Sequence, residues 1–204
     1  MDSLKQNIFL LAGDSEEAVT ELAQQLSACQ PRRTSFVIPS RLKQFRVFFQ
    51  ECYKYFNESP PTLLASSQAA EWLLDNFYVI EQALREIEEH LPSDFYQRLP
   101  KTQAGWLRVQ LVALANIRGE VRRLDLETLK GFLQTFQETT PLTTGEIWAL
   151  PLMLRLAVLD SLADALAALT NRKWDIPSPL SPSPSLSSHP PSDLNLIVAN
   201  SILD

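Results

Sequence analysis

Glycine is scarce in this sequence: there are 5 glycines among 204 residues, and no two of them lie close together. A loop that cradles a phosphate group needs closely spaced glycines, so the usual nucleotide-binding loop is excluded. Scarce glycine also favours helices over a β protein rich in turns. The length is sufficient for one core of ordinary size.

Cysteine and histidine are equally rare, with two residues of each. Cys29 and Cys52 lack the Cys-x-x-Cys spacing of zinc and redox sites, so we expect ordinary reduced thiols. A Ser-His or Cys-His nucleophile would have to use His90 or His189, and we expect both to be solvated. A four-helix di-iron site needs Glu-x-x-His pairs, but Ile87 occupies the position of the glutamate before His90. We therefore expect no metal, no cofactor and no catalytic centre.

Positive charge is also limited. The formal net charge is −6, and the basic pairs Arg32-Arg33 and Arg122-Arg123 are too few for a phosphate-binding groove, so we expect no nucleic-acid partner.

The longest apolar run follows Thr143 and contains Arg155 and two aspartates. Charges at these positions are costly in hydrocarbon, so we expect no membrane span in this chain.

The strongest helical pattern runs from Ser67 to Leu91. Its large apolar residues recur at steps of four and three and therefore line one side of a helix. These residues are Leu73, Phe77, Ile80, Leu84, Ile87 and Leu91. We predict that this spine helix supports the packing of the other helices. Asn76 borders the apolar stripe, so we expect it to make a hydrogen bond to another helix.

Similar patterns predict other helices. One begins at Asp14 or Ser15, with Val19, Leu22, Ala23 and Leu26 inward. An aromatic helix follows Pro39, and we expect its aromatic face to pack into the core. A buried helix covers 106–117, and another follows Asp125 with Leu126 on its inward face. Thr143 and Glu146 have the spacing of a capping box before a helix that should reach about Asn171. Arg155 lies among the leucines of that helix. We expect a structural ion pair with Asp75 or another acid of the spine helix rather than a ligand site.

These patterns predict an all-α fold, a compact bundle of about six to seven helices over residues 1–172. The composition changes abruptly after Trp174, and the segment 176–192 carries six prolines and many serines. We predict a disordered Pro/Ser-rich linker over 173–192. Residues 193–204 have the pattern of the first turns of a further, truncated helix.

Four segments of the sequence carry a resemblance to a known family: Ala69–Glu81, the turn Leu91–Pro100, Arg123–Leu129 and Pro141–Arg155. They resemble the region near the start of cyclic β-1,2-glucan synthases. They occur in the order expected for the family, and the resemblance covers about residues 40 to 170. Val198–Leu203 is similar to the family's continuation after this region.

Enzymes of that family are large inner-membrane proteins that transfer glucose from UDP-glucose onto a glucan held on the enzyme, then trim and cyclise it. The resemblance implies the cytosolic N-terminal portion of such an enzyme, truncated before the glycosyltransferase domain. No Asp-x-Asp motif occurs in this sequence, so no catalytic residue is carried over. The implied role is a scaffold for the transferase at the cytosolic face of the inner membrane. Its partner would be the remainder of a membrane-bound glucan synthase or another protein.

Two other hypotheses remain open: a stand-alone, cytoplasmic helical protein-protein interaction module, and an unrecognised small enzyme. The second lacks converging acid-base residues, and an assay with UDP-glucose would test it. The candidates for structural or interaction roles are Trp72, Asp75, Asn76, Glu146, Trp148 and Arg155.

Overall fold

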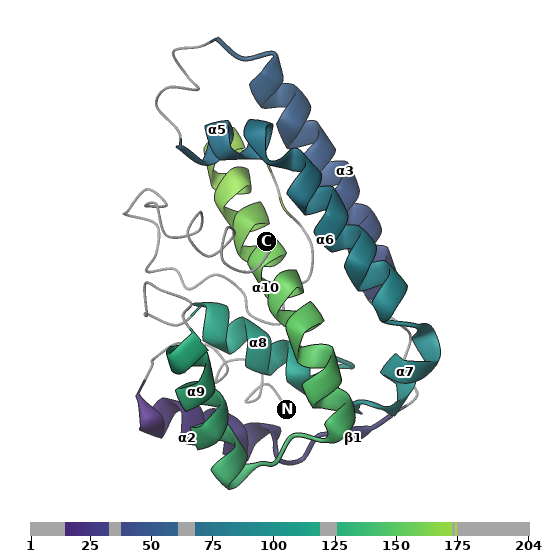
Figure 1. The fold of residues 1–204 in the computed structure, drawn as a ribbon, viewed down its shortest axis with the longest axis vertical. Coiled ribbons are helices and arrows are strands. Elements are labelled where there is room, and N and C mark those ends of the chain that lie inside the picture. The colour runs from purple at the N-terminus through teal and green to yellow at the C-terminus, as the bar shows by residue number, and fades with distance from the viewer. Residues whose placement is uncertain (1–14, 33–37, 61–67, 119–125, 173, 175–204) are drawn as a thin grey trace.

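The computed structural model describes residues 15–32, 38–60, 68–118, 126–172 and 174. The fold is all-α, as predicted (Figure 1). The described helices are α2 (Glu16–Leu26), α3 (Ile38–Asn57), α5 (Gln68–Asp75), α6 (Phe77–His90), α7 (Ser93–Arg98), α8 (Arg108–Arg118), α9 (Leu126–Thr139) and α10 (Thr144–Thr170). Two short strands, β1 (Gln30–Pro31) and β2 (Pro100–Lys101), pair antiparallel.

The predicted spine helix is interrupted, and this prediction was wrong in part. α5 ends at Asp75 and α6 begins at Phe77, with Asn76 between them at φ −118° and ψ 21°. The backbone N–H of Asn76 and its side-chain Nδ2 both donate to the carbonyl of Trp72, at 2.9 and 3.0 Å. Asparagine side chains that compete for backbone groups in this way disfavour a continuous helix. The expected hydrogen bond from Asn76 to another helix is therefore replaced by a local one.

The centre of the bundle is α10 rather than the predicted spine (Figure 1). α10 passes between the antiparallel pair α3 and α6 on one side and α8 on the other, and it also contacts α5. It begins after its N-cap Thr143 and ends at Asn171, whose φ of 50° is the left-handed conformation of a C-cap. The predicted bounds of this helix are confirmed.

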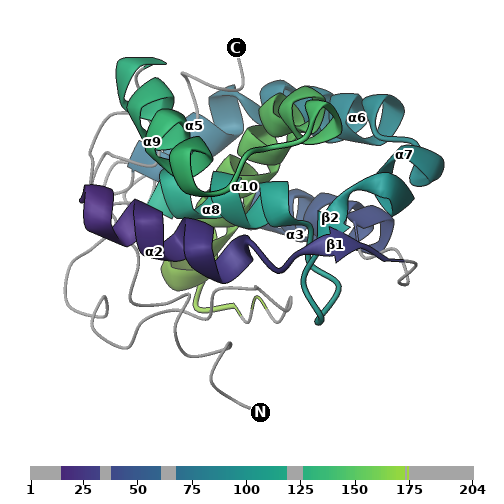
Figure 2. The same ribbon diagram turned by 90° about the horizontal axis from the view of Figure 1, so that it is seen from below.

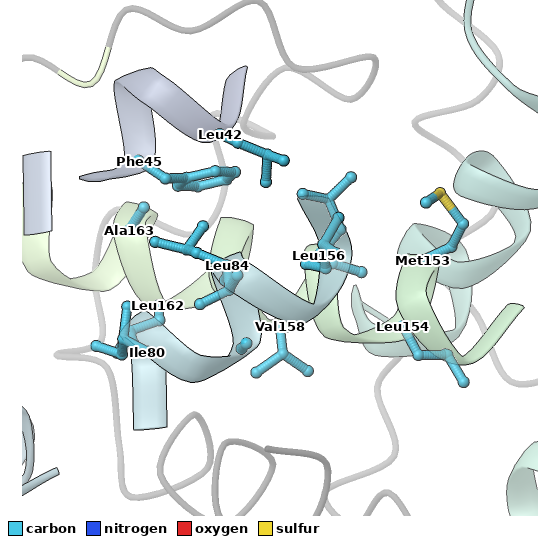
Figure 3. Close-up of a cluster of buried hydrophobic side chains, with 14 of the residues drawn as sticks. Leu42, Phe45, Ile80, Leu84, Met153, Leu154, Leu156, Val158, Leu162 and Ala163 are labelled. Carbon is cyan, nitrogen blue, oxygen red and sulfur yellow. The ribbon is translucent and has the colours of Figure 1, made fainter. Parts of the chain in front are cut away.

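The larger core lies where α3, α5, α6, α8 and α10 meet. Figure 3 shows Leu42 and Phe45 of α3, Ile80 and Leu84 of α6, and Leu156 and Leu162 of α10 in this cluster. The apolar stripe predicted over 73–91 is buried except for Phe77, which is half-buried. The aromatic face of α3 packs into the core as predicted, and Trp174 lies against Phe48 with ring centroids 4.3 Å apart.

A second, smaller core joins α2, α8 and α9 (Figure 2). The inward residues predicted for α2 are buried, and Phe136 of α9 packs with them. Leu126 is 76% exposed, so its predicted inward position was wrong. α8 takes part in both cores and is buried along most of its length, as predicted for 106–117.

Several predictions fall outside the described residues: the N-cap at Asp125, the linker over 173–192 apart from Trp174, and the helix start over 193–204. None of the helices in the described part of the chain is long and apolar enough to cross a membrane.

Candidate functional site

The start of α10 is fixed by a buried carboxylate. Glu146 is fully buried and forms the predicted capping box with Thr143: the Thr143 N–H and hydroxyl both donate to Glu146 Oε2, each at 2.9 Å. The Glu146 N–H donates to Thr143 Oγ1 at 3.3 Å. These bonds satisfy backbone donors that the first turn of a helix otherwise leaves unpaired.

Glu146 also pairs with Arg108, the first residue of α8. Arg108 Nε donates to Glu146 Oε1 at 2.8 Å, and Nη2 donates to Oε2 at 2.5 Å and to the carbonyl of Pro141 at 3.1 Å. The arginine is 5% exposed. A bidentate pair of this kind sets both the distance and the orientation of its partners. It therefore joins the first turn of α10 to the first turn of α8.

A second buried pair holds α3 against α10. The guanidinium of Arg41 donates to a carboxylate oxygen of Asp160, and both residues are 1% exposed. The same guanidinium lies 5.5 Å from the ring centroid of Phe45 and 5.8 Å from that of Trp106. Buried charges of this kind require a partner, and here each partner comes from a different helix.

Close packing at Gly145 brings α7 to the first turn of α10. A Cβ atom at Gly145 would lie 3.1 Å from Leu99 Cδ2 and 3.8 Å from the ring of Phe95. Glycine therefore allows this approach, which a side chain would resist. The contact joins two of the segments that carry the sequence resemblance, 91–100 and 141–155.

These two segments also form most of an open groove of about 620 Å³ between the end of α6, α7 and the first half of α10. Trp148 lines this groove and is 75% exposed. The apolar part of its lining comes from Leu91, Pro92, Phe95 and Leu152. We call this the Trp148 groove. An exposed tryptophan beside an apolar depression is typical of a binding surface rather than of a solvated helix face.

Three polar side chains complete the Trp148 groove: Glu86, His90 and Arg155. Arg155 Nε lies 3.5 Å from Glu86 Oε2, and both side chains are partly exposed. The predicted ion pair of Arg155 with an acid of the 67–91 segment is thus present, with Glu86 rather than Asp75 as the partner. His90 Nδ1 lies 3.0 Å from the carbonyl oxygen of Glu86.

The remaining candidate residues lie away from this groove. Trp72 is 8% exposed and belongs to the larger core, whereas Asp75 is exposed at the end of α5. Asn76 marks the break between α5 and α6. The structure thus brings Trp148 and Arg155 together in one groove. Glu146 is buried instead, and Trp72, Asp75 and Asn76 lie elsewhere.

The described residues contain no group of three or more histidines, cysteines, aspartates or glutamates that could hold a metal ion.

Sequence reasoning missed the roles of Arg41, Arg108 and Asp160. One signal was available, because a charged residue within an apolar helical run must find a partner or reach water.

Burial raises the pKa of Cys52 to about 11, which keeps this thiol protonated and unreactive near neutral pH.

Comparison with known proteins agrees with the sequence resemblance. No protein-family profile matches the chain. Over 167 residues the chain is 28% identical to the cyclic beta-(1,2)-glucan synthase NdvB of Rhizobium meliloti (strain 1021). The chain is similar to a glucan synthase. The match covers 79% of this chain but 6% of NdvB, so the chain spans a small part of that protein's length. The similarity supports an origin related to a glycosyltransferase.

Proposed function

We propose that this chain is a non-catalytic helical scaffold of a cyclic β-1,2-glucan synthase-like enzyme and positions the transferase at the cytosolic face of the inner membrane. The similarity to NdvB over 79% of the chain carries the proposal. The buried pairs Arg108–Glu146 and Arg41–Asp160 support it, because they fix α10 against α8 and α3. A scaffold needs such fixed geometry between its elements.

The chemistry of the described residues supports a role without catalysis. A catalytic site requires a nucleophile or an acid-base pair placed together with groups that stabilise developing charge. Glu146 and Asp160 are buried and bonded to arginines. Among the acids of α6, Glu81, Glu88 and Glu89 are exposed, and Glu86 is paired with Arg155. Glucose transfer from UDP-glucose would then reside in the catalytic part of the enzyme.

A stand-alone interaction module is the second candidate. The exposure of Trp148 favours it, because tryptophan is enriched among the residues that contribute most to protein interfaces. Under this alternative the chain would bind a protein unrelated to glucan synthesis.

The scaffold proposal is tested by assembly. NdvB lacking the segment that matches this chain would be solubilised in detergent and mixed with the purified chain, and the mixture analysed by size-exclusion chromatography. We expect co-elution, and we expect no glucose transfer from UDP-glucose by the chain alone. Glucose transfer by the isolated chain would contradict the proposal, as would elution of the two proteins as separate species.

A further inference from the structure

The Trp148 groove combines three properties that together describe a kind of ligand. Its lining includes one exposed aromatic side chain, several other apolar side chains and three polar side chains. The exposed aromatic side chain is Trp148, and the rest of the apolar lining comes from Leu91, Pro92, Phe95 and Leu152. Its volume of about 620 Å³ lies within the roughly 300–1,000 Å³ range of small-molecule sites.

The three polar side chains offer both kinds of hydrogen-bonding group. The Arg155 guanidinium only donates and the Glu86 carboxylate only accepts, while His90 offers its Nε2, because its Nδ1 lies 3.0 Å from the Glu86 carbonyl oxygen. A ligand that satisfies all three must itself both donate and accept along its edge. Sugar hydroxyls do both, and a pyranose ring also presents a face of C–H bonds that packs on an aromatic ring.

The charges of the groove point to a neutral ligand. Arg155 and Glu86 lie 3.5 Å apart, so their opposite charges largely cancel at the surface of the groove. No unpaired cation among the groove residues is left to hold a diphosphate, which binds best to clustered arginine or lysine. The chemistry therefore favours an uncharged saccharide over a nucleotide sugar.

We propose that the Trp148 groove binds a neutral glucan chain, with one glucose ring stacked on Trp148 and its hydroxyls bonded to Arg155, Glu86 and His90. The choice of a β-(1,2)-linked glucan rests on the proposed function. The apolar face of a protein helix fits the groove less well, because it would remove the partly exposed Arg155–Glu86 pair from water, whereas sugar hydroxyls can replace that water. A glucan presents hydroxyls continuously along its length.

Binding would be measured on the full chain with a linear β-(1,2)-linked gluco-oligosaccharide, by calorimetry and by tryptophan fluorescence. We expect binding to the wild type and a blue shift of the exposed Trp148. Trp148→Ala should weaken binding roughly tenfold, which corresponds to the loss of one aromatic contact. Trp148→Phe should retain part of the affinity without the fluorescence change.

Tyr78→Ala is the matched control, because Tyr78 is an aromatic residue of α6 that is 62% exposed outside the groove. It should bind like the wild type. The inference is overturned if the wild type does not bind, if Trp148→Ala binds equally well, or if UDP-glucose binds as tightly as the oligosaccharide. It is also overturned if the shortened NdvB shields Trp148 while the oligosaccharide does not, since the groove would then be a protein-docking surface. Loss of glucan binding with intact co-elution would remove this inference and leave the scaffold proposal standing.

Discussion

Replacing Glu146 by glutamine tests how the start of α10 is held. The substitution keeps the size of the side chain and removes its charge, which leaves the guanidinium of Arg108 buried without its anion. Breaking one partner of a buried pair costs about 3–5 kcal/mol. That is a large fraction of the roughly 5–15 kcal/mol by which a domain is stable.

Urea unfolding followed by circular dichroism would measure this loss. With a slope of about 2 kcal/mol per molar urea, the midpoint should fall by roughly 2 M. Glu127→Gln is the control, because Glu127 is an exposed glutamate in the first turn of α9 and should change the free energy of unfolding by less than about 0.5 kcal/mol.

The double variant Arg108→Met with Glu146→Leu separates the contribution of the buried ion pair to the free energy of unfolding from that of the capping box. Apolar residues of similar volume often replace a buried pair without loss, so two contributions should be missing: about 1 kcal/mol from the cap and about 1 kcal/mol from the Arg108 hydrogen bond to the Pro141 carbonyl. The double variant should therefore be more stable than Glu146→Gln. If Glu146→Gln costs less than about 1 kcal/mol, or if the double variant is the less stable of the two, our account of the buried charge is wrong.

Three further predictions concern glycine, cysteine and tryptophan. Gly131→Ala should stabilise the protein by about 0.5–1 kcal/mol, because Gly131 lies inside α9 and a Cβ atom there would meet nothing within 4 Å. Thermal unfolding should show a higher midpoint than that of the wild type, and a lower midpoint would contradict the prediction. The pKa of Cys52 rises from 9.0 to about 11 on folding, so the unfolded thiol loses its proton first and stability should fall by about 2–3 kcal/mol from pH 9 to 11. Cys52→Ala should lack that part of the decline, and an unchanged pH profile would refute it. Trp148→Ala should change the free energy of unfolding by less than about 1 kcal/mol in urea, since its side chain is largely exposed; a larger loss would show that Trp148 supports the fold.

The helices were predictable where their apolar residues repeat with a clear period. The residues expected to face inward on α2 are buried, and α10 has the predicted capping box and end. The break at Asn76 was not predictable from periodicity, because the apolar stripe continues in phase across it. The break depends on a local hydrogen bond from the Asn76 side chain to the Trp72 carbonyl, which the period does not record.

The candidate site was predictable only in part. Arg155 was expected to pair with an acid of the 67–91 segment, but the choice of Glu86 over Asp75 depends on how α6 lies against α10. The pairing of Arg108 with Glu146 joins residues 38 positions apart, and that of Arg41 with Asp160 joins residues 119 apart. Contacts between residues this far apart in the sequence depend on tertiary packing, which a local pattern does not record. The Trp148 groove likewise depends on tertiary packing, because its lining comes from α6, α7, the turn between them and α10.

Exchange of the matching segment in NdvB tests the scaffold claim most directly. The segment of NdvB that is similar to this chain would be replaced by the chain's own residues, and glucan synthesis from UDP-glucose would be measured in membranes. Deletion of the segment would serve as the baseline, with equal protein levels verified by immunoblot. We predict that the exchanged enzyme makes substantially more glucan than the deletion. Synthesis no higher than that of the deletion, from an exchanged enzyme present at the same level, would contradict the claim.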